Sequence, residues 1–482
     1  MLRLLFALLP LCSMLLLGSA MAFPEAGAGI GEGPVAREFH RAATEQRLVR
    51  RGEAGLLAGL ADTARANADA TIWTISLTDG GTALSAHEAA ERLGRARRDP
   101  MKRLLFRHVL GWSGREAPAG ILPLGPGSLR FLLDRPDPAF PARLAEIEAS
   151  LCDETGVSND AGCGPFRADV HLGAEGHGLA RPRPALGAIE RWNVLEAGPA
   201  GTAFDLFGAA GVLADAQGGI VRLGFVLPGV PEYCSAGGGP PAAESGLLAH
   251  FFLLVAPGSR AESADLRSAL AADAILPGAR PASWVPAARL VPGGRSPGPP
   301  PPAPAKASAR PVLVLAYDGG EPVLRCIAER VRAALWTAGR DVQLNGPGGD
   351  EPPESGSGGT PDLTLVMGLT RKRPEAWDHL RLLLALAGED RREELLQAAE
   401  KEGALPGGDP FDEEWRIAAA LERRLSAEGS IVPLLVAPVS WWLEAPGWPV
   451  ELLDGVLPVW GEPLRPFVIA RSDAAAQRDA EP

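Results

Sequence analysis

The sequence has little of what metal sites and hydrolytic active sites need. It contains five cysteines and seven histidines, no C-x-x-C pair, and no histidine at ligand spacing from a cysteine. Gly294-Arg295-Ser296-Pro297-Gly298 has the G-x-S-x-G spacing of serine hydrolases but lies in a proline-rich stretch, so no nucleophile elbow between a strand and a helix is present. The glycine-rich segments lie in proline-rich stretches and do not lead from a strand into a helix, as phosphate-binding loops do. We therefore expect no metal site, no cofactor and no enzymatic activity.

Positive charge is also scarce. The 47 lysines and arginines face 59 aspartates and glutamates, and the formal net charge is -12. A phosphate backbone is bound by clustered basic side chains, and here the two signs are interspersed, so we expect no nucleic-acid partner. Hydrophobic residues make up 46% of the sequence and include 11 tryptophans. This content is enough for the buried cores of two or more lobes.

One apolar run, Leu4–Leu17, lies close to the N-terminus and follows a positive charge. It is shorter than the roughly 20 apolar residues that a membrane-spanning helix needs. The segment ends in Ala20-Met21-Ala22, the small-x-small pattern that signal peptidase cleaves. We predict a signal peptide over residues 1–22 and a periplasmic location. A lipid anchor on Cys12 is the alternative, which the bulky Leu11 before it disfavours.

Four cysteines follow the predicted signal peptide, an even number that suits two disulfides in an oxidising compartment. Cys152 and Cys163 are the better pair, because they bracket a polar stretch rich in turn-forming residues. Cys234 and Cys326 are the two that remain, and they lie far apart in the sequence.

The first half of the sequence alternates helical and strand patterns. Apolar residues that return at about 3.6 positions predict helices over Glu45–Ala66 and Phe140–Leu151. Alternating or continuous apolar residues predict strands over Thr71–Leu77 and Leu129–Leu133. Between these two strands, Ser85 is expected to cap a helix that reaches Leu93 or beyond.

The second half gives stronger signals. Val312–Tyr317 is a continuous apolar run typical of a fully buried strand. A helix with one apolar face follows and ends near Gly339, and Val342–Leu344 returns as a strand. This order predicts a parallel strand–helix–strand unit. A further strand is expected over Asp362–Met367 and a helix over Trp377–Ala399.

In this order the elements resemble the family 5 extracellular solute-binding proteins, which are the dipeptide, oligopeptide and nickel receptors of ABC importers. The sharpest likeness is Gly162-Cys163-Gly164-Pro165-Phe166, which stands where the family has Gly-Thr-Gly-Pro-Tyr; an ordinary turn is the alternative for this segment. The other segments that carry the resemblance are Trp73–Leu93, Leu129–Leu144, Leu253–Ala274, Leu313–Leu344 and Leu421–Leu435.

The resemblance implies an α/β fold of the two-lobe periplasmic-binding-protein type II, cluster C-like, with mixed sheets and reduced by deletions. Lobe I is expected over residues 23–240, with 439–471 returning to it, and lobe II over 241–438. Lobe II contains residues 292–311, whose eight prolines predict an extended linker. Residues 472–482 are expected to form a disordered tail.

A peptide-like or other small solute would then bind between the two lobes of a monomer, and the closed protein would dock on an ABC permease in the inner membrane. One alternative is a degenerate family member that acts as a sensor or as an envelope interaction protein without transport. A less favoured alternative is an exported hydrolase.

One departure from the family bears on the ligand. In the peptide receptors, the strand similar to Pro361–Gly368 leads to an aromatic residue and an aspartate that pairs with the ligand's ammonium group. Here it leads to Arg371, Lys372 and Arg373. Arginine binds carboxylates and phosphates through paired hydrogen bonds, so this cluster predicts an anionic ligand, with a solvated loop as the alternative. Trp441 and Trp442, which are neighbours in the sequence, are expected either to line the bottom of the ligand-binding cleft or to pack in the core.

Overall fold

The structure is a computed structural model. It describes, with short gaps, residues 45–151, 243–270, 284–290, 312–346, 361–443 and 451–471, together with strands between 166 and 226 and four residues between 35 and 42. The predicted signal peptide, Cys152 and Cys163, the linker 292–311 and the tail 472–482 lie outside the described residues.

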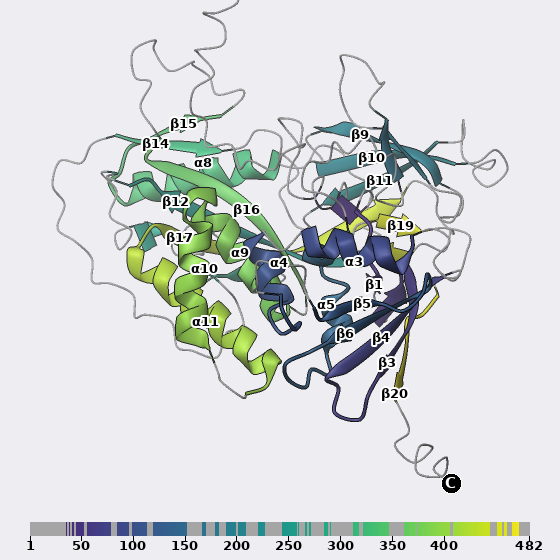
Figure 1. The fold of residues 1–482 in the computed structure, drawn as a ribbon. Coiled ribbons are helices and arrows are strands. Elements are labelled where there is room, and N and C mark those ends of the chain that lie inside the picture. Colours follow the sequence, from purple (N-terminus) through teal and green to yellow (C-terminus); the bar gives the residue numbers. More distant parts are fainter. Residues whose placement is uncertain are drawn as a thin grey trace, which may run out of the picture.

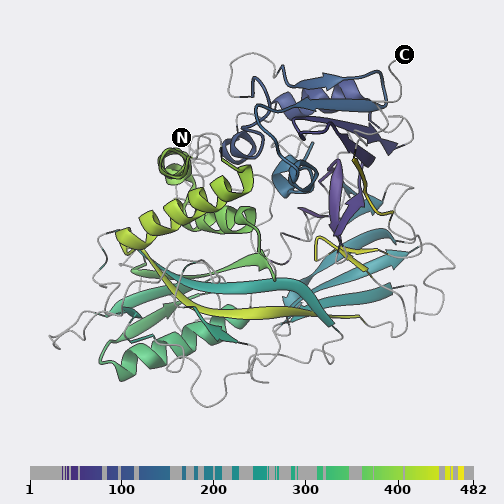
Figure 2. The ribbon, with the colours of Figure 1, turned by 90° about the horizontal axis from the view of Figure 1, so that it is seen from below.

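An 11-stranded mixed sheet forms the larger part of the molecule (Figure 1), in the order β15-β14-β16-β12-β17-β11-β10-β9-β8-β7, with β13 beside β17. Its strands are β7 (Phe166–Asp169), β8 (Leu179–Pro182), β9 (Ile189–Gly198), β10 (Gly201–Gly208), β11 (Ile220–Val226), β12 (Ala243–Val255), β13 (Val285–Pro286), β14 (Leu313–Tyr317), β15 (Val342–Asn345), β16 (Leu363–Arg371) and β17 (Ile431–Leu443). In Figure 2, β12 and β17 run from the part that contains β14 to the part that contains β9–β11. These two paired strands therefore join both parts of the sheet.

Helices cover both faces of the sheet around β12, β14 and β16. Helix α8 (Pro322–Thr337) packs on one face with Phe251, and α9 (Ala376–Ala387), α10 (Glu389–Gly403) and α11 (Pro410–Glu428) pack on the other with Phe252. Successive strand residues point to opposite faces, so a strand covered on both sides is apolar throughout, as the segment from Leu247 to Val255 nearly is.

The strand–helix–strand unit predicted for this region is confirmed. β14 pairs parallel with β15 and with β16, and Gly339 follows α8 with a φ of +75°, which glycine adopts without steric cost. The helix predicted over Trp377–Ala399 is divided into α9 and α10, because Gly388 adopts a φ of +79° between them.

A five-stranded sheet forms the second part of the molecule. Its order is β20-β3-β4-β6-β5, and it consists of β3 (Ala61–Ala66), β4 (Ile72–Leu77), β5 (Ile121–Pro123), β6 (Ser128–Leu132) and β20 (Val468–Arg471). The short helices of this part are α3 (Ala86–Arg95), α4 (Pro100–Leu105), α5 (Phe140–Arg143) and the 3-10 turn η3 (Ile147–Ala149). We call this sheet with its helices the small-sheet body, and the 11-stranded sheet with α8–α11 the large-sheet body.

The strands predicted over Thr71–Leu77 and Leu129–Leu133 are confirmed as β4 and β6, and the capping role of Ser85 is confirmed by a hydrogen bond of 3.2 Å from the Glu88 backbone N–H to its Oγ. The single helix expected over Phe140–Leu151 is wrong. The segment forms α5 and the separate turn η3 instead.

The helix predicted over Glu45–Ala66 is also wrong. The segment forms β1 (Val49–Gly52), β2 (Gly55–Ala58) and β3. Gly55 has a φ of +143°, and a Cβ on Gly59 would lie 2.4 Å from the carbonyl oxygen of Arg47. The backbone of Gly55 is therefore incompatible with a regular right-handed helix, and at Gly59 the chain passes so close to Arg47 that a side chain would clash. The strand partners of β3 are β4 and the distant β20, which the local apolar period does not reveal.

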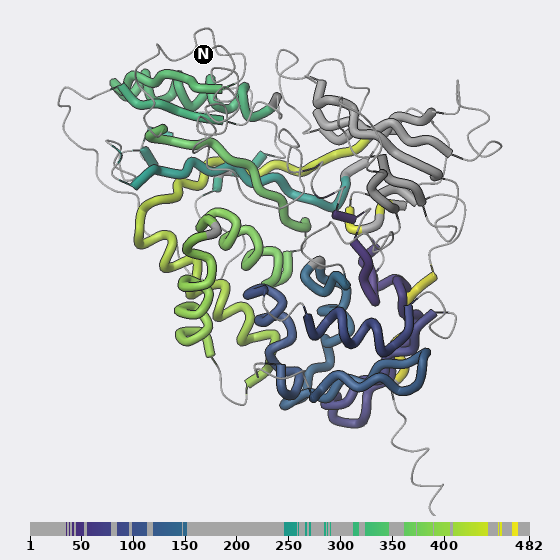
Figure 3. The backbone as a smooth tube through the Cα atoms, turned by 45° about the horizontal axis from the view of Figure 1, so that its top comes forward, coloured from purple at the N-terminus to yellow at the C-terminus, as the bar shows by residue number. Residues whose placement is uncertain are grey.

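The two bodies share a hydrophobic core. Helix α4 contacts α10, and Figure 3 draws the two helices side by side. Met101 and Leu104 of α4 belong to the same buried cluster as Leu395, Leu396 and Ala399 of α10. Within the described residues, none of the helices combines the length and the apolar composition needed to cross a bilayer.

Candidate functional site

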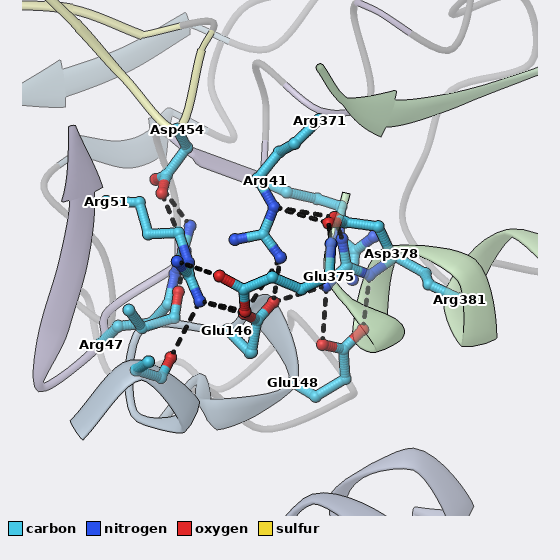
Figure 4. Close-up of polar contacts among 12 residues, drawn as sticks. Arg41, Arg47, Arg51, Glu146, Glu148, Arg371, Glu375, Asp378, Arg381 and Asp454 are labelled. Atoms are coloured by element: carbon cyan, nitrogen blue, oxygen red, sulfur yellow. Dashed lines mark hydrogen bonds and ion pairs between the residues drawn. The ribbon is translucent and has the colours of Figure 1, made fainter. Parts of the chain in front are cut away.

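Charged side chains from both bodies meet where the end of β16 approaches the small-sheet body (Figure 4). They come from β1, from the α5–η3 segment, from the end of β16 and the start of α9, and from the turn between β18 (Glu451–Leu453) and β19 (Leu457–Val459). We call this group the junction cluster. Its members are Arg47, Arg50, Arg51, Glu146, Glu148, Arg371, Glu375, Asp378, Arg381 and Asp454.

Glu146 is the centre of the junction cluster, because three guanidinium groups bind its carboxylate. Arg51 Nη2 donates to Oε1 at 2.7 Å. Arg371 Nη2 lies 3.1 Å from Oε1 and 3.2 Å from Oε2, and Arg381 Nη2 donates to Oε2 at 3.2 Å. The Glu146 side chain is 2% exposed, whereas those of Arg51, Arg371 and Arg381 are 19%, 23% and 24% exposed. The carboxylate is thus enclosed by cations that solvent still reaches.

The N-terminus of α9 fixes the orientation of Arg371. Asp378 accepts from Arg371 Nε at 2.9 and 2.8 Å through its two oxygens, and it also accepts from the backbone N–H of the N-cap residue Glu375 at 2.9 Å. Glu375 in turn accepts two hydrogen bonds of 2.9 Å from Arg51. Helix start and ion pairs are therefore one connected network.

Asp454 closes the other side of the junction cluster. It lies in the β18–β19 turn with a φ of +54°, and it accepts from Arg47 at 3.1 and 2.8 Å and from Arg50 at 3.1 Å. Burial, followed by the neighbouring charge of Arg47, lowers the pKa of Arg50 to about 10. The turn is held in place by buried arginines of β1 and of the residues before it.

The junction cluster holds five arginines and five carboxylates, so its charges balance. Burial alone would raise the pKa of Glu146 and of Glu148, but the arginines around them outweigh it and lower both pKa values. The same contacts raise the pKa of Arg371 against the effect of its own burial. Glu146, Glu148 and Arg371 are therefore ionised at neutral pH, and a further charge placed among these residues would upset the balance.

More ion pairs cross the same interface between α4, the β6–α5 segment and the helices α10 and α11. They are Arg103–Glu393 at 3.3 Å, Arg135–Glu413 at 2.8 Å and the buried pair Arg143–Glu414. In the described part of the chain, no three His, Cys, Asp or Glu side chains are placed to hold a metal ion.

Of the predicted ligand residues, Arg371 lies in the junction cluster. It is the last residue of β16, which is longer than the predicted strand because β12 pairs with it as far as Leu247 opposite Arg371. Lys372 follows with an exposed side chain, and its backbone N–H donates to the carbonyl of Gly246 at 2.6 Å. Arg373 lies outside the described residues.

The other predicted residues lie elsewhere or are not described. Trp441 and Trp442 belong to β17 opposite β11. The half-buried Trp441 packs against the core beneath α8, and its Nε1 has no hydrogen-bond partner. Phe166 begins β7. Gly162, Gly164, Pro165 and the two cysteines that are predicted to pair, Cys152 and Cys163, lie outside the described residues.

Most residues of the junction cluster have no separate signal in the amino-acid sequence. Glu146 lies 225 residues from Arg371 and 95 from Arg51. Only Glu375 and Asp378 carried a local hint, since an acid three residues after an N-cap is typical of a helix start. The ion pairs of Glu146 join segments that are distant in the sequence, so only the folded structure reveals them.

Comparisons with known proteins identify the fold. The chain is similar to a substrate-binding protein from Microbacterium hydrocarbonoxydans complexed with 4-hydroxybenzoate hydrazide, with 17% identity and a TM-score of 0.53 over 90% of this chain and 96% of that one. It is also similar to the murein tripeptide-binding protein MppA of Escherichia coli, with 18% identity and a TM-score of 0.54 over 87% and 91% of the two chains. A third similar protein is OppA of Haemophilus influenzae in complex with RPPGFSPFR, with 14% identity and a TM-score of 0.54 over 87% of this chain and 92% of that one.

Neither protein-family models nor curated sequences give a match. The structural likenesses nevertheless extend over most of each chain, so this chain has the fold of the substrate-binding proteins. The predicted α/β binding-protein fold with mixed sheets is confirmed, and the resemblance to family 5 is confirmed at the level of fold. The three named neighbours are all binding proteins.

Proposed function

We propose that the protein is a non-enzymatic solute-binding protein, a divergent relative of the family 5 receptors, which binds a small solute and delivers it to an ABC permease. The observation that carries the proposal is the fold, which is similar to that of substrate-binding proteins over 84–90% of this chain and is joined across its two parts by β12 and β17. Paired strands that continue through two parts of one sheet can bend as a hinge while each part stays rigid.

The predicted signal peptide supports a periplasmic location, where the protein would act as a monomer. We propose the same two lobes as the sequence predicts: lobe I over residues 23–240 with 439–471, and lobe II over residues 241–438. The predicted Cys152–Cys163 disulfide suits the oxidising compartment. Transport further requires that closure around the solute favour docking on the permease, a population shift between open and closed forms.

The solute class remains to be measured, and a thermal-shift screen of the mature protein is the first experiment. Peptides, sugars, metal chelates and organic acids are added separately, because a ligand at a hundred times its Kd adds about 2.7 kcal/mol to the folded state. We expect one class to raise the melting temperature with a saturable dose dependence. Turnover of ester or peptide substrates in the same samples would contradict the proposal and favour an exported hydrolase.

We propose that the solute reaches Arg371, Lys372 and Arg373, with Trp441 and Trp442 at the edge of the site. The test replaces Arg371 and Lys372 by serine and measures the affinity for the best ligand of the screen by calorimetry, well below the melting temperature of the variant. Loss of at least about tenfold in affinity is expected, since a charge-assisted hydrogen bond is worth about 1.5–3 kcal/mol. The control is R391S, an exposed arginine paired with Glu428. Equal affinity in both variants would exclude these cations from the site.

A second function is favoured by the interface itself. The shared core of α4 and α10 and the ion pairs around it connect the two bodies through side chains of the chain itself. Bodies that are held together in this way suit a sensor or an envelope interaction protein better than a transporter. Pull-down with the purified permease separates the two functions, because only the transporter requires that contact.

A further inference from the structure

The carboxylate of Glu146 occupies a site that is complementary to any carboxylate group. Its two oxygens receive four contacts of 2.7–3.2 Å from Arg51, Arg371 and Arg381. A carboxylate offers about four lone-pair positions, so the three guanidinium groups satisfy it completely. These groups come from β1, β16 and α9, and in Figure 4 they converge on this one side chain. The recognition is directed at the carboxylate and not at the backbone that carries it.

The segment that carries Glu146 contains only very short helical elements. α5 has four residues and η3 has three, and the backbone bonds around Glu146 reach only three residues, to Arg143 on one side and from Ala149 on the other. A shift of the backbone that withdraws the Glu146 side chain would therefore not disrupt a long helix. The cost of withdrawing it lies in the loss of the three arginines.

We propose that Glu146 is a tethered carboxylate that holds the small-sheet body on β16 and α9, and that a solute with a carboxylate group competes with it for Arg371 and Arg381. This inference rests on the proposed function, because it gives the chemical class of the solute. Exchange of one carboxylate for another conserves the charge balance of the junction cluster. A neutral or cationic solute at the same place would remove the carboxylate that the three arginines share and leave fewer acids than arginines there, which is unfavourable.

Access to the site supports the exchange. The side chains of the three arginines are each about one-fifth to one-quarter exposed, whereas that of Glu146 is 2% exposed, so solvent contacts these arginines although it scarcely reaches the carboxylate between them. Glu148 is a suitable comparison. It is also buried, at 7% exposure, but among the described residues its ion pairs are with Arg381, at 2.7 and 2.9 Å.

The test is chemical rescue. E146A removes the tethered carboxylate, and E148A is the matched control from two positions away. Each variant and the unaltered protein are melted in increasing acetate or propionate, with sodium chloride at equal ionic strength as the reference. We expect E146A to melt several degrees lower than the unaltered protein and to recover part of that loss with a saturable acetate dependence. E148A should recover little, because it leaves the three-arginine site occupied.

Two further measurements keep the inference open to refutation. E146Q retains a carbonyl oxygen that fills the site, so acetate should not rescue it. If E146A does not fold, the unaltered protein is titrated with succinate and with its diamide, and only succinate should raise the melting temperature. Equal effects of the two compounds, or equal effects of acetate and chloride on E146A, would overturn the inference.

The outcomes also separate this inference from the proposed function. A neutral solute found in the screen, together with no acetate rescue, leaves the solute-binding function standing and removes the carboxylate competitor. Acetate rescue without any ligand in the screen supports the tethered carboxylate and counts against the solute-binding function.

Discussion

Asp454 has a backbone conformation that few non-glycine residues adopt, and its ion pairs explain why it does so. With a φ of +54° it sits in the left-handed region, which aspartate tolerates better than most residues. From there its carboxylate reaches Arg47 and Arg50, whose side chains are only 3% and 7% exposed. One acid therefore balances two buried cations that belong to β1 and the residues before it.

Replacing Asp454 by alanine should destabilise the protein strongly. Loss of one partner from a buried ion pair costs about 3–5 kcal/mol, because the remaining charge stays buried. D454N is the matched comparison, since asparagine tolerates the same backbone conformation and keeps one acceptor oxygen, and it should cost less. Urea unfolding of the three proteins measures the difference. Equal losses for both variants would mean that the turn, and not the charge, requires aspartate.

At the scale of elements, the sequence predicted what local signals determine. The βαβ unit of β14, α8 and β15 and the start of α3 at Ser85 each depend on neighbouring residues, and both are confirmed. The strands β1–β3 were missed because the apolar residues of Glu45–Ala66 return at a helix-like period. β1 and β2 pair with each other, and β3 pairs with β4 and also with β20, which is about 400 residues away in the chain. For the site, Arg371 was found through a charge reversal, whereas Glu146 pairs with it only after folding.

Two glycines at helix ends, Gly388 and Gly429, should differ in how well they tolerate substitution by asparagine. Gly388, between α9 and α10, has φ +79° and ψ 159°, a region open almost only to glycine, whereas Gly429 after α11 has φ +67° and ψ 9° in the left-handed helical region that asparagine also adopts. G388N should therefore cost about 1–3 kcal/mol and G429N clearly less. Thermal unfolding of the two variants checks this, and a larger loss for G429N would contradict the assignment of these two helix ends.

At the scale of the whole molecule, the interface between the bodies combines a dry part and a charged part. The contact of α4 with α10 buries apolar side chains whose stabilising effect does not depend on pH. The pairs of Glu146 and Glu148 with Arg371 and Arg381 beside it do depend on pH, since the carboxylates must be ionised. Acid should therefore weaken one part of the interface and leave the other intact.

The sign of this effect follows from the lowered pKa values of Glu146 and Glu148. Their ordinary pKa is 4.5. Against the effect of burial, Arg371, Arg51 and Arg381 lower the pKa of Glu146, and Arg381 and Arg41 lower that of Glu148. Their stabilising contribution is complete above pH 4.5 and is lost as the pH falls below that value towards the folded-state pKa values. Replacing both acids by glutamine removes this titration, so the free energy of unfolding of the double variant should fall less steeply below pH 4.5 than that of the unaltered protein.

Denaturant unfolding from pH 7 to pH 3 measures the two slopes, and small-angle scattering at the same pH values reports whether the bodies separate. The exposed Glu402, which pairs with Arg423 at the surface, provides the control, because exposed pairs contribute only about 0–1 kcal/mol. E402Q should follow the unaltered protein closely. His250, whose pKa is lowered to about 4 by burial and by His379, titrates equally in all three proteins and cancels in the comparison. Parallel curves for the double variant and the unaltered protein below pH 4.5 would contradict this prediction, because they would mean that Glu146 and Glu148 do not cause the acid sensitivity of the protein.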